Sequence, residues 1–130
     1  TLAGVIESKQ ERARIAQRYD LDQTQIDYLA RLYGGGLDEM LSMAEASNAM
    51  RRIHPELPAV YGQILFAMRH EMAARLSDFT AVSTYLRYYR RWTREEIQRM
   101  AAFMGAQLGW EERRIKREVE DEYTQNFANG

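Results

Sequence analysis

Three ionisable residues lie at helical spacing near the middle of the chain. Glu71 precedes Arg75 by four positions, and Asp78 follows Arg75 by three. Opposite charges at these spacings meet on one face, provided that a helix continues through all three residues. Two carboxylates can perform general acid–base chemistry, but an arginine between them keeps both ionised, which is the wrong state for a proton donor at neutral pH. We therefore expect structural or interface ion pairs and assign no catalytic residue.

The residues that bind metals or cofactors are scarce. The chain has two histidines and no cysteine, and His54 and His70 do not form the helical pair typical of a zinc site. Adjacent residues on a helix point in different directions, so His70 beside Glu71 is interpreted as a packing or surface residue. The triplet Gly34–Gly36 lacks the Lys-Ser/Thr pair of a phosphate loop and is interpreted as a helix stop. We expect no metal and no cofactor to bind to this segment.

The segment Tyr85–Trp92 reads YLRYYRRW and alternates cations with aromatic residues. Such a segment can lie at a lipid headgroup boundary or stack on bases. The net charge of -1 gives no wider basic field, so nucleic-acid binding is not expected. We favour an interpretation in which half of these side chains face the core and the arginines form a solvated edge. Binding to a membrane surface or an acidic partner through this segment stays open as the alternative.

The elements that position these residues are predicted to be helices. Apolar residues recur at steps of three and four along the chain, and no strand-like alternation occurs. We predict an all-α protein, a compact bundle of about six helices that ends in an antiparallel helical hairpin. Residues 1–20 are predicted to form a peripheral N-terminal helix, which contacts the rest through Ile15 and Tyr19.

Two consecutive helices are predicted in the central stretch. The first is expected to place these residues in the core: Val60, Ile64, Ala67, Met68 and Met72. The second is expected to begin at Ser77, which would accept a backbone N–H, and to bury these residues: Phe79, Val82, Leu86 and Tyr89. All seven methionines are expected to fill the core.

Capping signals mark the starts of two further helices. Asp22 is an acceptor three residues ahead of Gln25, whose amide can return a bond. Thr93 and Glu96 form a capping box, and the helix that they begin is expected to bury its face as far as Leu108 and to stop at the following glycine. A last helix is expected to open at Trp110, with its apolar residues every four positions and its charges on the outer side.

Length and composition indicate one globular domain over residues 1–130. The chain is 45% hydrophobic and 28% charged, without cysteine. No apolar stretch approaches the roughly 20 residues that span a bilayer, and the first residues do not resemble a signal peptide. We expect a cytoplasmic location. Peripheral contact with the cytoplasmic face of the membrane is compatible with this expectation. Because the chain begins at Thr1 rather than at methionine, we expect it to be a fragment of a larger protein.

Three sequence motifs carry a resemblance to a known family. They are LARLYG from Leu29, FAMRHEMAARLSDF from Phe66 and MGAQLGWEERRIKREVEDEY from Met104. In this order and spacing they resemble the C-terminal helical domain of FAD-dependent glycerol-3-phosphate dehydrogenases and alpha-glycerophosphate oxidases, over about residues 22 to 125. The family positions matched here are Tyr33-Gly34, Glu71, Ala73, Asp78-Phe79 and Leu108-Gly109-Trp110.

The chain departs from the family pattern after Asp78-Phe79. The family usually has an arginine pair and a threonine two residues further on, where this chain has Val82, Ser83 and Thr84. Thr84 is retained, and Arg87, about one helical turn further along, is expected to take over part of the role of the missing arginines. We therefore add Thr84 and Arg87 to Glu71, Arg75 and Asp78 as structural or interface candidates.

The resemblance implies an enzyme of two parts. An N-terminal flavin domain on the same polypeptide would bind FAD and oxidise sn-glycerol 3-phosphate to dihydroxyacetone phosphate, with electrons passed to quinone or, in the oxidases, to oxygen. This chain would be the C-terminal accessory or cap domain, without an active site of its own. The alternative is an independent helical interaction module that uses Tyr85–Trp92.

Overall fold

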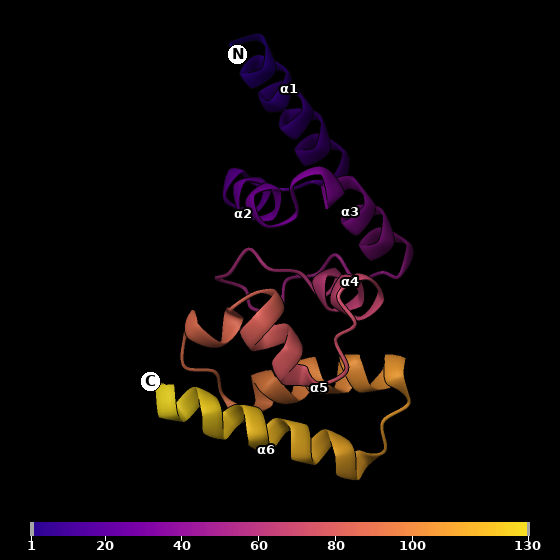
Figure 1. The fold of residues 1–130 in the computed structure, drawn as a ribbon, viewed down its shortest axis with the longest axis vertical. Coiled ribbons are helices and arrows are strands. Elements are labelled where there is room, and N and C mark those ends of the chain that lie inside the picture. Colours follow the sequence, from indigo (N-terminus) through magenta and orange to yellow (C-terminus); the bar gives the residue numbers. More distant parts are fainter. Residues whose placement is uncertain (1, 130) are drawn as a thin grey trace. The chain divides into compact units, whose positions relative to one another are not determined.

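The protein is helical throughout the part that the structure describes. The computed structural model describes residues 2–129, with side chains for residues 8–126 (Figure 1). Its six α-helices are α1 (Leu2–Tyr19), α2 (Gln23–Tyr33), α3 (Leu37–Ala46), α4 (Gly62–His70), α5 (Arg94–Leu108) and α6 (Glu112–Asn129). Two 3-10 helices (Gly34–Gly36, Leu86–Tyr88) and a π-helical segment (Asp78–Ser83) lie between them. The predicted all-α class with about six helices is confirmed.

The chain divides into two compact units, Thr1–Gln63 and Ile64–Gly130. Helix α4 begins at the end of the first unit and continues into the second. The single domain expected from length and composition stays a prediction, and each unit is described by itself below.

Helices α1, α2 and α3 build the first unit. Ile15 and Tyr19 of α1 are buried, as predicted. The Asp22 carboxylate accepts from the Gln25 N–H at 2.8 Å and caps α2, whereas the Gln25 side chain donates to the Pro58 carbonyl at 3.4 Å rather than returning to the cap. Helix α2 stops where Gly34 adopts φ +51. Helix α3 buries one apolar face: Leu37, Met40, Leu41 and Ala44.

The connector between α3 and α4 is non-helical, as its two prolines predict. Arg52 ties it to α2 by donating to the Leu57 carbonyl at 2.9 Å and to the Asp22 carboxylate at 2.6 Å. At the start of α4, a Cβ on Gly62 would overlap the Cβ of Ala44. Only glycine therefore allows the two helices to approach this closely within the first unit.

The central stretch departs from its prediction at the end of α4. That helix stops at His70, whose ring stacks on Phe66 with centroids 4.4 Å apart. Met72 then adopts φ +58 and is 87% exposed, so the expectation that every methionine fills the core is wrong. A left-handed residue interrupts the helical period, and the apolar periodicity of the sequence continues past the point where the helix has ended.

The second central helix is also not a regular α-helix. The π-helical segment is followed by Tyr85 at φ +58 and by the short 3-10 helix. Phe79 and Leu86 are buried as predicted, whereas Val82 and Tyr89 are exposed. The π-helix and the left-handed turn change the angle per residue, so residues three and four apart no longer share one face.

Helices α5 and α6 form the predicted antiparallel hairpin in the second unit (Figure 1). The capping box is present, with the Glu96 N–H donating to Thr93 Oγ1 at 3.1 Å and the Thr93 N–H donating to Glu96 Oε1 at 2.9 Å. Helix α5 ends at Leu108, and the residue that caps it, Gly109, adopts φ +74. Leu108 was expected in the core but is 43% exposed. Helix α6 begins at Glu112, two residues later than predicted.

Candidate functional site

A stripe of polar side chains runs along the buried face of α6. Its members are Glu118, Glu122 and Asn126, each four positions after the last, and each is at most 7% exposed. Residues at this spacing lie above one another on one side of a helix. Buried polar groups require hydrogen-bond partners, and all those of the stripe that lie outside α6 come from one segment, residues 74–92, which we call the central loop.

Glu118 holds the start of the central loop. One carboxylate oxygen accepts from the Leu76 N–H at 2.8 Å, and the other accepts from Arg114 Nε at 3.1 Å. Arg114 also donates to the Ala74 carbonyl at 3.1 Å and lies over the ring of Trp110 at 4.5 Å. Acceptors and donors of α6 thus satisfy backbone groups that no regular helix pairs at this point.

Glu122 holds the middle of the central loop. Arg87 donates to both of its carboxylate oxygens, from Nε at 2.9 Å and from Nη2 at 2.9 Å, and the Thr80 hydroxyl donates to Oε1 at 2.7 Å. The hydrogen bonds to Glu122 raise the pKa of Arg87 although its burial acts in the opposite direction. A bidentate ion pair of this kind fixes the orientation of both side chains and favours their charged forms.

Asn126 holds the end of the central loop. Its amide oxygen accepts from the Trp92 N–H at 2.7 Å, and its amide nitrogen donates to the carbonyls of Arg87 at 2.8 Å and Arg90 at 3.0 Å. The Trp92 indole donates to the Leu86 carbonyl at 2.8 Å. One side chain of α6 therefore satisfies three backbone groups of an irregular segment.

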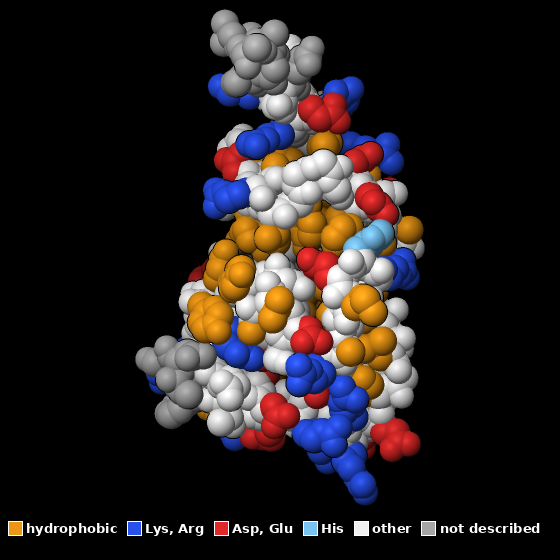
Figure 2. Space-filling model, in the orientation of Figure 1, with side chains coloured by type: hydrophobic (Ala, Val, Ile, Leu, Met, Phe, Trp, Pro, Cys, Tyr) orange, Lys and Arg blue, Asp and Glu red, His pale blue; other side chains and the backbone are white. Residues whose placement is uncertain are grey.

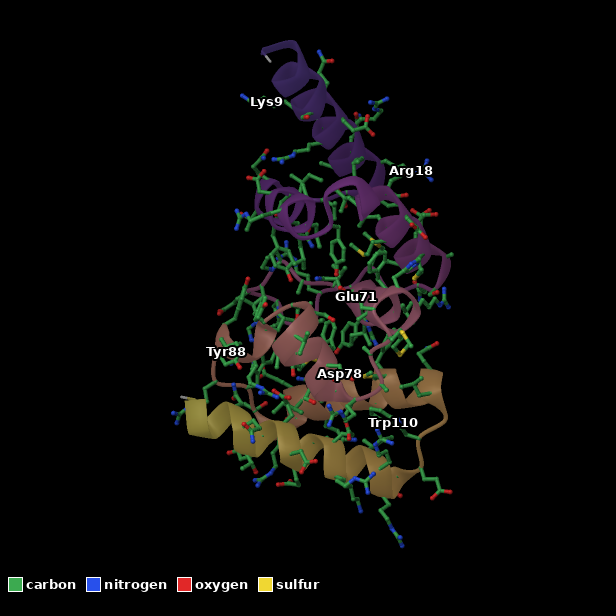
Figure 3. All side chains as sticks on the ribbon, in the orientation of Figure 1. Lys9, Arg18, Glu71, Asp78, Tyr88 and Trp110 are labelled. Atoms are coloured by element: carbon green, nitrogen blue, oxygen red, sulfur yellow. The ribbon has the colours of Figure 1, made fainter. Side chains whose placement is uncertain are left out.

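The predicted chain of charges from Glu71 to Asp78 is only partly brought together (Figure 3). Arg75 and Asp78 approach to 3.6 Å. Glu71 is exposed in the turn after α4, and the positive φ of Met72 breaks the helix that would have placed it beside Arg75. The interface role of these three residues stays a prediction.

Ser77 makes no capping hydrogen bond, so the expectation that its side chain accepts a backbone N–H at this helix start is wrong. The side-chain acceptor at this point is Asp78, which binds N–H groups of the residues that precede it. Its Oδ2 accepts from the N–H groups of Ala74 at 2.9 Å and Arg75 at 3.1 Å. Burial raises the pKa of the carboxyl, but these two hydrogen bonds and the nearby Arg75 charge outweigh burial and lower the pKa below its ordinary value. The aspartate is therefore held ionised.

Thr84 and Arg87, the two candidates suggested by the resemblance, are internal. Thr84 is 2% exposed; its hydroxyl donates to the Phe79 carbonyl at 2.8 Å and accepts from the Leu86 N–H at 3.3 Å. Arg87 is 9% exposed, so the expectation of a fully solvated arginine edge is wrong at this position. Arg87 reaches inward because a buried carboxylate, Glu122, lies beneath it.

The sequence interpretation missed the stripe itself. The charges of α6 were expected on its outer side, and pairs such as Arg94 with Glu120 at 2.9 Å do lie there. Glu118 and Glu122 instead face inward. The spacing that joins them to Asn126 was present in the sequence, but a run in which nearly every residue is charged does not show which carboxylates meet distant backbone groups.

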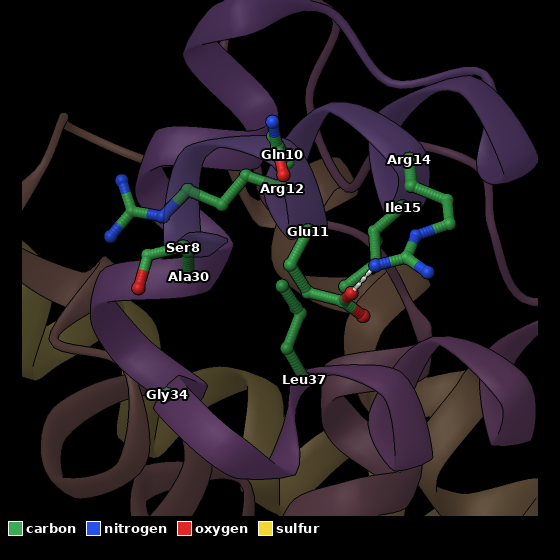
Figure 4. Close-up of a pocket in the computed structure, with 9 residues that line it drawn as sticks. All are labelled: Ser8, Gln10, Glu11, Arg12, Arg14, Ile15, Ala30, Gly34 and Leu37. Atoms are coloured by element: carbon green, nitrogen blue, oxygen red, sulfur yellow. Dashed lines mark hydrogen bonds and ion pairs between the residues drawn. The ribbon is translucent and has the colours of Figure 1, made fainter. Parts of the chain in front are cut away.

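A hollow of the first unit lies beside α1, near the start of α3 (Figure 4). It measures about 610 Å³ and is lined in part by Glu11, Arg12, Arg14 and Ile15. Glu11 pairs with Arg14, and Arg12 approaches Asp27 at 3.9 Å. Its charges are balanced on exposed side chains, so the hollow gives no reason to assign a reaction to it.

Neither a metal-binding cluster nor a membrane-spanning helix is present among the residues that the structure describes. Within residues 8–126, no group of three or more histidine, aspartate or glutamate side chains lies close enough to hold a metal ion. None of the helices that the structure describes is both long and apolar enough to cross a membrane.

Comparison with protein families identifies the chain. The model of the family described as the C-terminal domain of alpha-glycerophosphate oxidase matches residues 1–115, from α1 to the first turn of α6. This match starts and ends earlier than the resemblance seen in the sequence, and it confirms that resemblance. No curated protein and no solved structure gives a significant match. The chain therefore belongs to the family of the C-terminal domain of alpha-glycerophosphate oxidase and is the C-terminal part of an oxidoreductase of that type.

Proposed function

We propose that the chain is the accessory domain of an FAD-dependent enzyme that oxidises sn-glycerol 3-phosphate to dihydroxyacetone phosphate. Quinone is the proposed electron acceptor. The observation that carries the proposal is the family match over residues 1–115. An N-terminal domain of the same polypeptide would bind the FAD, which accepts the hydride, and this chain would support that domain.

The glycine-rich segment Gly34–Gly36 does not fit a flavin dinucleotide. A dinucleotide fingerprint places spaced glycines between a strand and a helix, so that backbone N–H groups meet the pyrophosphate. Here Gly34–Gly36 follow α2 and form a 3-10 turn instead. We therefore place the flavin outside this chain and derive no reaction step from its residues.

The ionisable groups of the second unit support a structural role. A general acid or base must exchange a proton with substrate. Arg87 and Glu122 instead occupy each other at two points, and Glu118 is bound by a backbone N–H and by Arg114. These groups stabilise the conformation of the central loop. That is the role expected of ionisable groups in a supporting domain.

The test compares the full-length enzyme with a form that lacks this domain. We expect the deletion to lower flavin retention and glycerol-3-phosphate oxidation, measured by flavin absorbance and by reduction of a quinone analogue. Unchanged stability and turnover would overturn the supporting role. Because a deletion can fail to fold, the 130-residue chain is also purified alone, and flavin binding or substrate turnover by that chain would overturn the proposal as well.

A second function is favoured by one observation. Tyr85, Tyr88 and Tyr89 are all at least 49% exposed, as an interaction module using Tyr85–Trp92 would require. We propose that the protein is cytoplasmic. In this second function, the segment Tyr85–Trp92 would contact the cytoplasmic face of the membrane as a peripheral interaction module. Co-sedimentation with anionic vesicles at low salt tests it, because electrostatic attraction is strongest there. Failure to bind would remove the membrane alternative.

A further inference from the structure

An exposed cluster of apolar and aromatic side chains lies on the central loop. It consists of Val82, Tyr85, Tyr88 and Tyr89, which are 68%, 59%, 56% and 49% exposed, and we call it the tyrosine surface. The Tyr88 N–H donates to the Tyr85 carbonyl at 3.0 Å, and this hydrogen bond closes the turn that carries the tyrosines. Figure 3 labels Tyr88, and hydrophobic side chains gather at the same place in the space-filling view (Figure 2).

The backbone beneath the tyrosine surface is strained and held in place. Tyr85 adopts φ +58, an uncommon conformation for a bulky residue, directly after a π-helical segment. Strained residues and π-helical turns persist where the surrounding structure over-determines them, and they concentrate at functional sites. Here the buried pair of Arg87 and Glu122 and the hydrogen bonds of Asn126 hold this backbone in its conformation. The backbone that carries the tyrosine surface is therefore fixed in one conformation.

A groove beside the tyrosine surface carries both signs of charge. It measures about 520 Å³, and Val82 belongs to its lining together with Arg75, Asp78 and Asp121. An anionic bilayer or a nucleic acid would be met by a basic surface. The charged side chains that line the groove include Arg75 and Arg87 but also four carboxylates, so the groove is acidic on balance. Exposed tyrosine rings next to such a mixed, mainly acidic groove instead match a protein surface, in which aromatic residues are enriched and polar groups form the rim.

We propose that the tyrosine surface and the adjoining groove dock the N-terminal flavin domain of the same polypeptide. This inference rests on the proposed function, which places such a domain in the parent enzyme. A covalently attached partner is present at a high effective concentration, so a patch of modest area is enough to hold it. Interfaces between domains of one chain are also more polar than permanent ones, as a tyrosine-rich surface is.

The first experiment measures side-chain accessibility in the full-length enzyme. Hydroxyl-radical footprinting compares each tyrosine of the surface in the native and the guanidinium-unfolded enzyme. Since a docked interface excludes water, we expect Tyr85, Tyr88 and Tyr89 to react at least about fivefold more slowly in the native enzyme. Native rates near half of the unfolded rates, as the exposures of this chain alone predict, would overturn the proposal.

The second experiment places charge on the surface. The full-length Val82→Asp/Tyr88→Asp variant is compared with Leu108→Asp, which adds a carboxylate at an exposed apolar residue at the end of α5. We expect the double variant alone to separate the domains, seen as a larger radius of gyration in X-ray scattering and faster cleavage between the domains. Equal behaviour of the two variants would overturn the proposal. Trp92 fluorescence reports whether the central loop stays folded, and Tyr88→Phe, which keeps the ring, is expected to dock normally.

Binding of a different partner to the tyrosine surface and failure of the proposed enzymatic function would give results that differ from one another. Protection of the tyrosines that rises with enzyme concentration and with a dimer in light scattering would indicate a second copy and overturn the proposal. Protection seen only with phosphatidylglycerol vesicles would indicate a membrane and overturn it as well. An enzyme whose tyrosines are protected but which does not oxidise glycerol 3-phosphate would refute the proposed substrate and leave the docking surface supported.

Discussion

Arg87 and Glu122 form a two-pronged ion pair inside the second unit, with both N–O distances 2.9 Å. The pair joins the central loop to α6, and the two side chains are 9% and 3% exposed. Because each charge is taken out of water, each depends on the other for compensation. The conformation of the central loop should therefore be sensitive to the loss of either partner.

Removal of one partner of this pair should be strongly destabilising. We expect Glu122→Ala to cost about 3–5 kcal/mol, because Arg87 is left buried without its counter-charge. Arg87→Met/Glu122→Leu, which removes both charges, should cost less than either charge removed alone. Chemical denaturation of Glu122→Ala, Arg87→Met and the double variant measures these differences.

The control for this prediction is the exposed pair of Arg94 and Glu120. It has similar geometry, with N–O distances of 2.9 and 3.2 Å, but both side chains are more than half exposed. Because water screens such a pair, Glu120→Ala should leave the midpoint of unfolding almost unchanged. Equal losses from Glu120→Ala and Glu122→Ala would contradict the importance of burial.

Asn126→Ala should loosen the end of the central loop. The substitution leaves the Trp92 N–H without its acceptor and two carbonyls without their donor, and an unsatisfied buried group costs about 1–3 kcal/mol. We expect that loss in denaturation, together with a red shift of the tryptophan fluorescence as water reaches the Trp92 indole, measured with Trp110 replaced by phenylalanine. Asn126→Asp keeps the acceptor but loses both donors, so it should not restore the wild-type stability. A fluorescence spectrum unchanged in Asn126→Ala would contradict the anchoring role.

Asp78 should make stability depend on pH at the acidic end. Its pKa is lower in the folded protein than its ordinary value of 3.8, so the folded state binds fewer protons. Its contribution is therefore fully present above that value and is lost as the pH falls through it towards the folded pKa. Asp78→Asn should cost at most about 1 kcal/mol at pH 7, because the amide keeps an acceptor but loses the charge that strengthens the two hydrogen bonds and pairs with Arg75.

The measurement for Asp78 is the melting temperature of wild type and Asp78→Asn between pH 7 and pH 2.5. The gap between the two proteins should be constant down to about pH 5 and should close below the ordinary aspartate pKa. A gap that persists undiminished at the lowest pH would show that the loss in Asp78→Asn is not electrostatic.

Two glycines with open space around them should respond oppositely to alanine. A Cβ at Gly109 or at Gly35 would meet no atom within 4 Å, but Gly109 adopts φ +74 and Gly35 does not have a positive φ. Gly109→Ala should cost roughly 1–2 kcal/mol, the penalty of the left-handed conformation. Gly35→Ala should be neutral or stabilising, since it restricts the unfolded chain. Thermal unfolding of both variants checks the contrast, and equal effects would contradict it.

Much of the fold could be predicted because its signals are local. The capping box of Thr93 and Glu96 and the stop at Gly109 delimit α5, and both ends were found from a few adjacent residues. The same is true of the stop of α2 at Gly34. Such signals are short in range, and the backbone groups that they satisfy lie within the same turn.

The central loop could not be predicted because its partners are distant in sequence. Periodicity continued through Met72 and Val82 although the backbone turned left-handed and π-helical around them. What stabilises that backbone is Glu118 and Glu122, 42 residues away from the groups that they accept from at Leu76 and Thr80. No local pattern distinguishes these two carboxylates from their solvated neighbours on α6.

The position of the stripe has a practical consequence for how the domain is delimited. The family match ends at residue 115, whereas Glu118, Glu122 and Asn126 follow it. A polypeptide trimmed to the matched residues would keep the motifs by which relatives are detected, yet it would lack the side chains that give the tyrosine-bearing segment its conformation. Domain boundaries drawn by homology alone would in this case remove the support and retain the surface that depends on it.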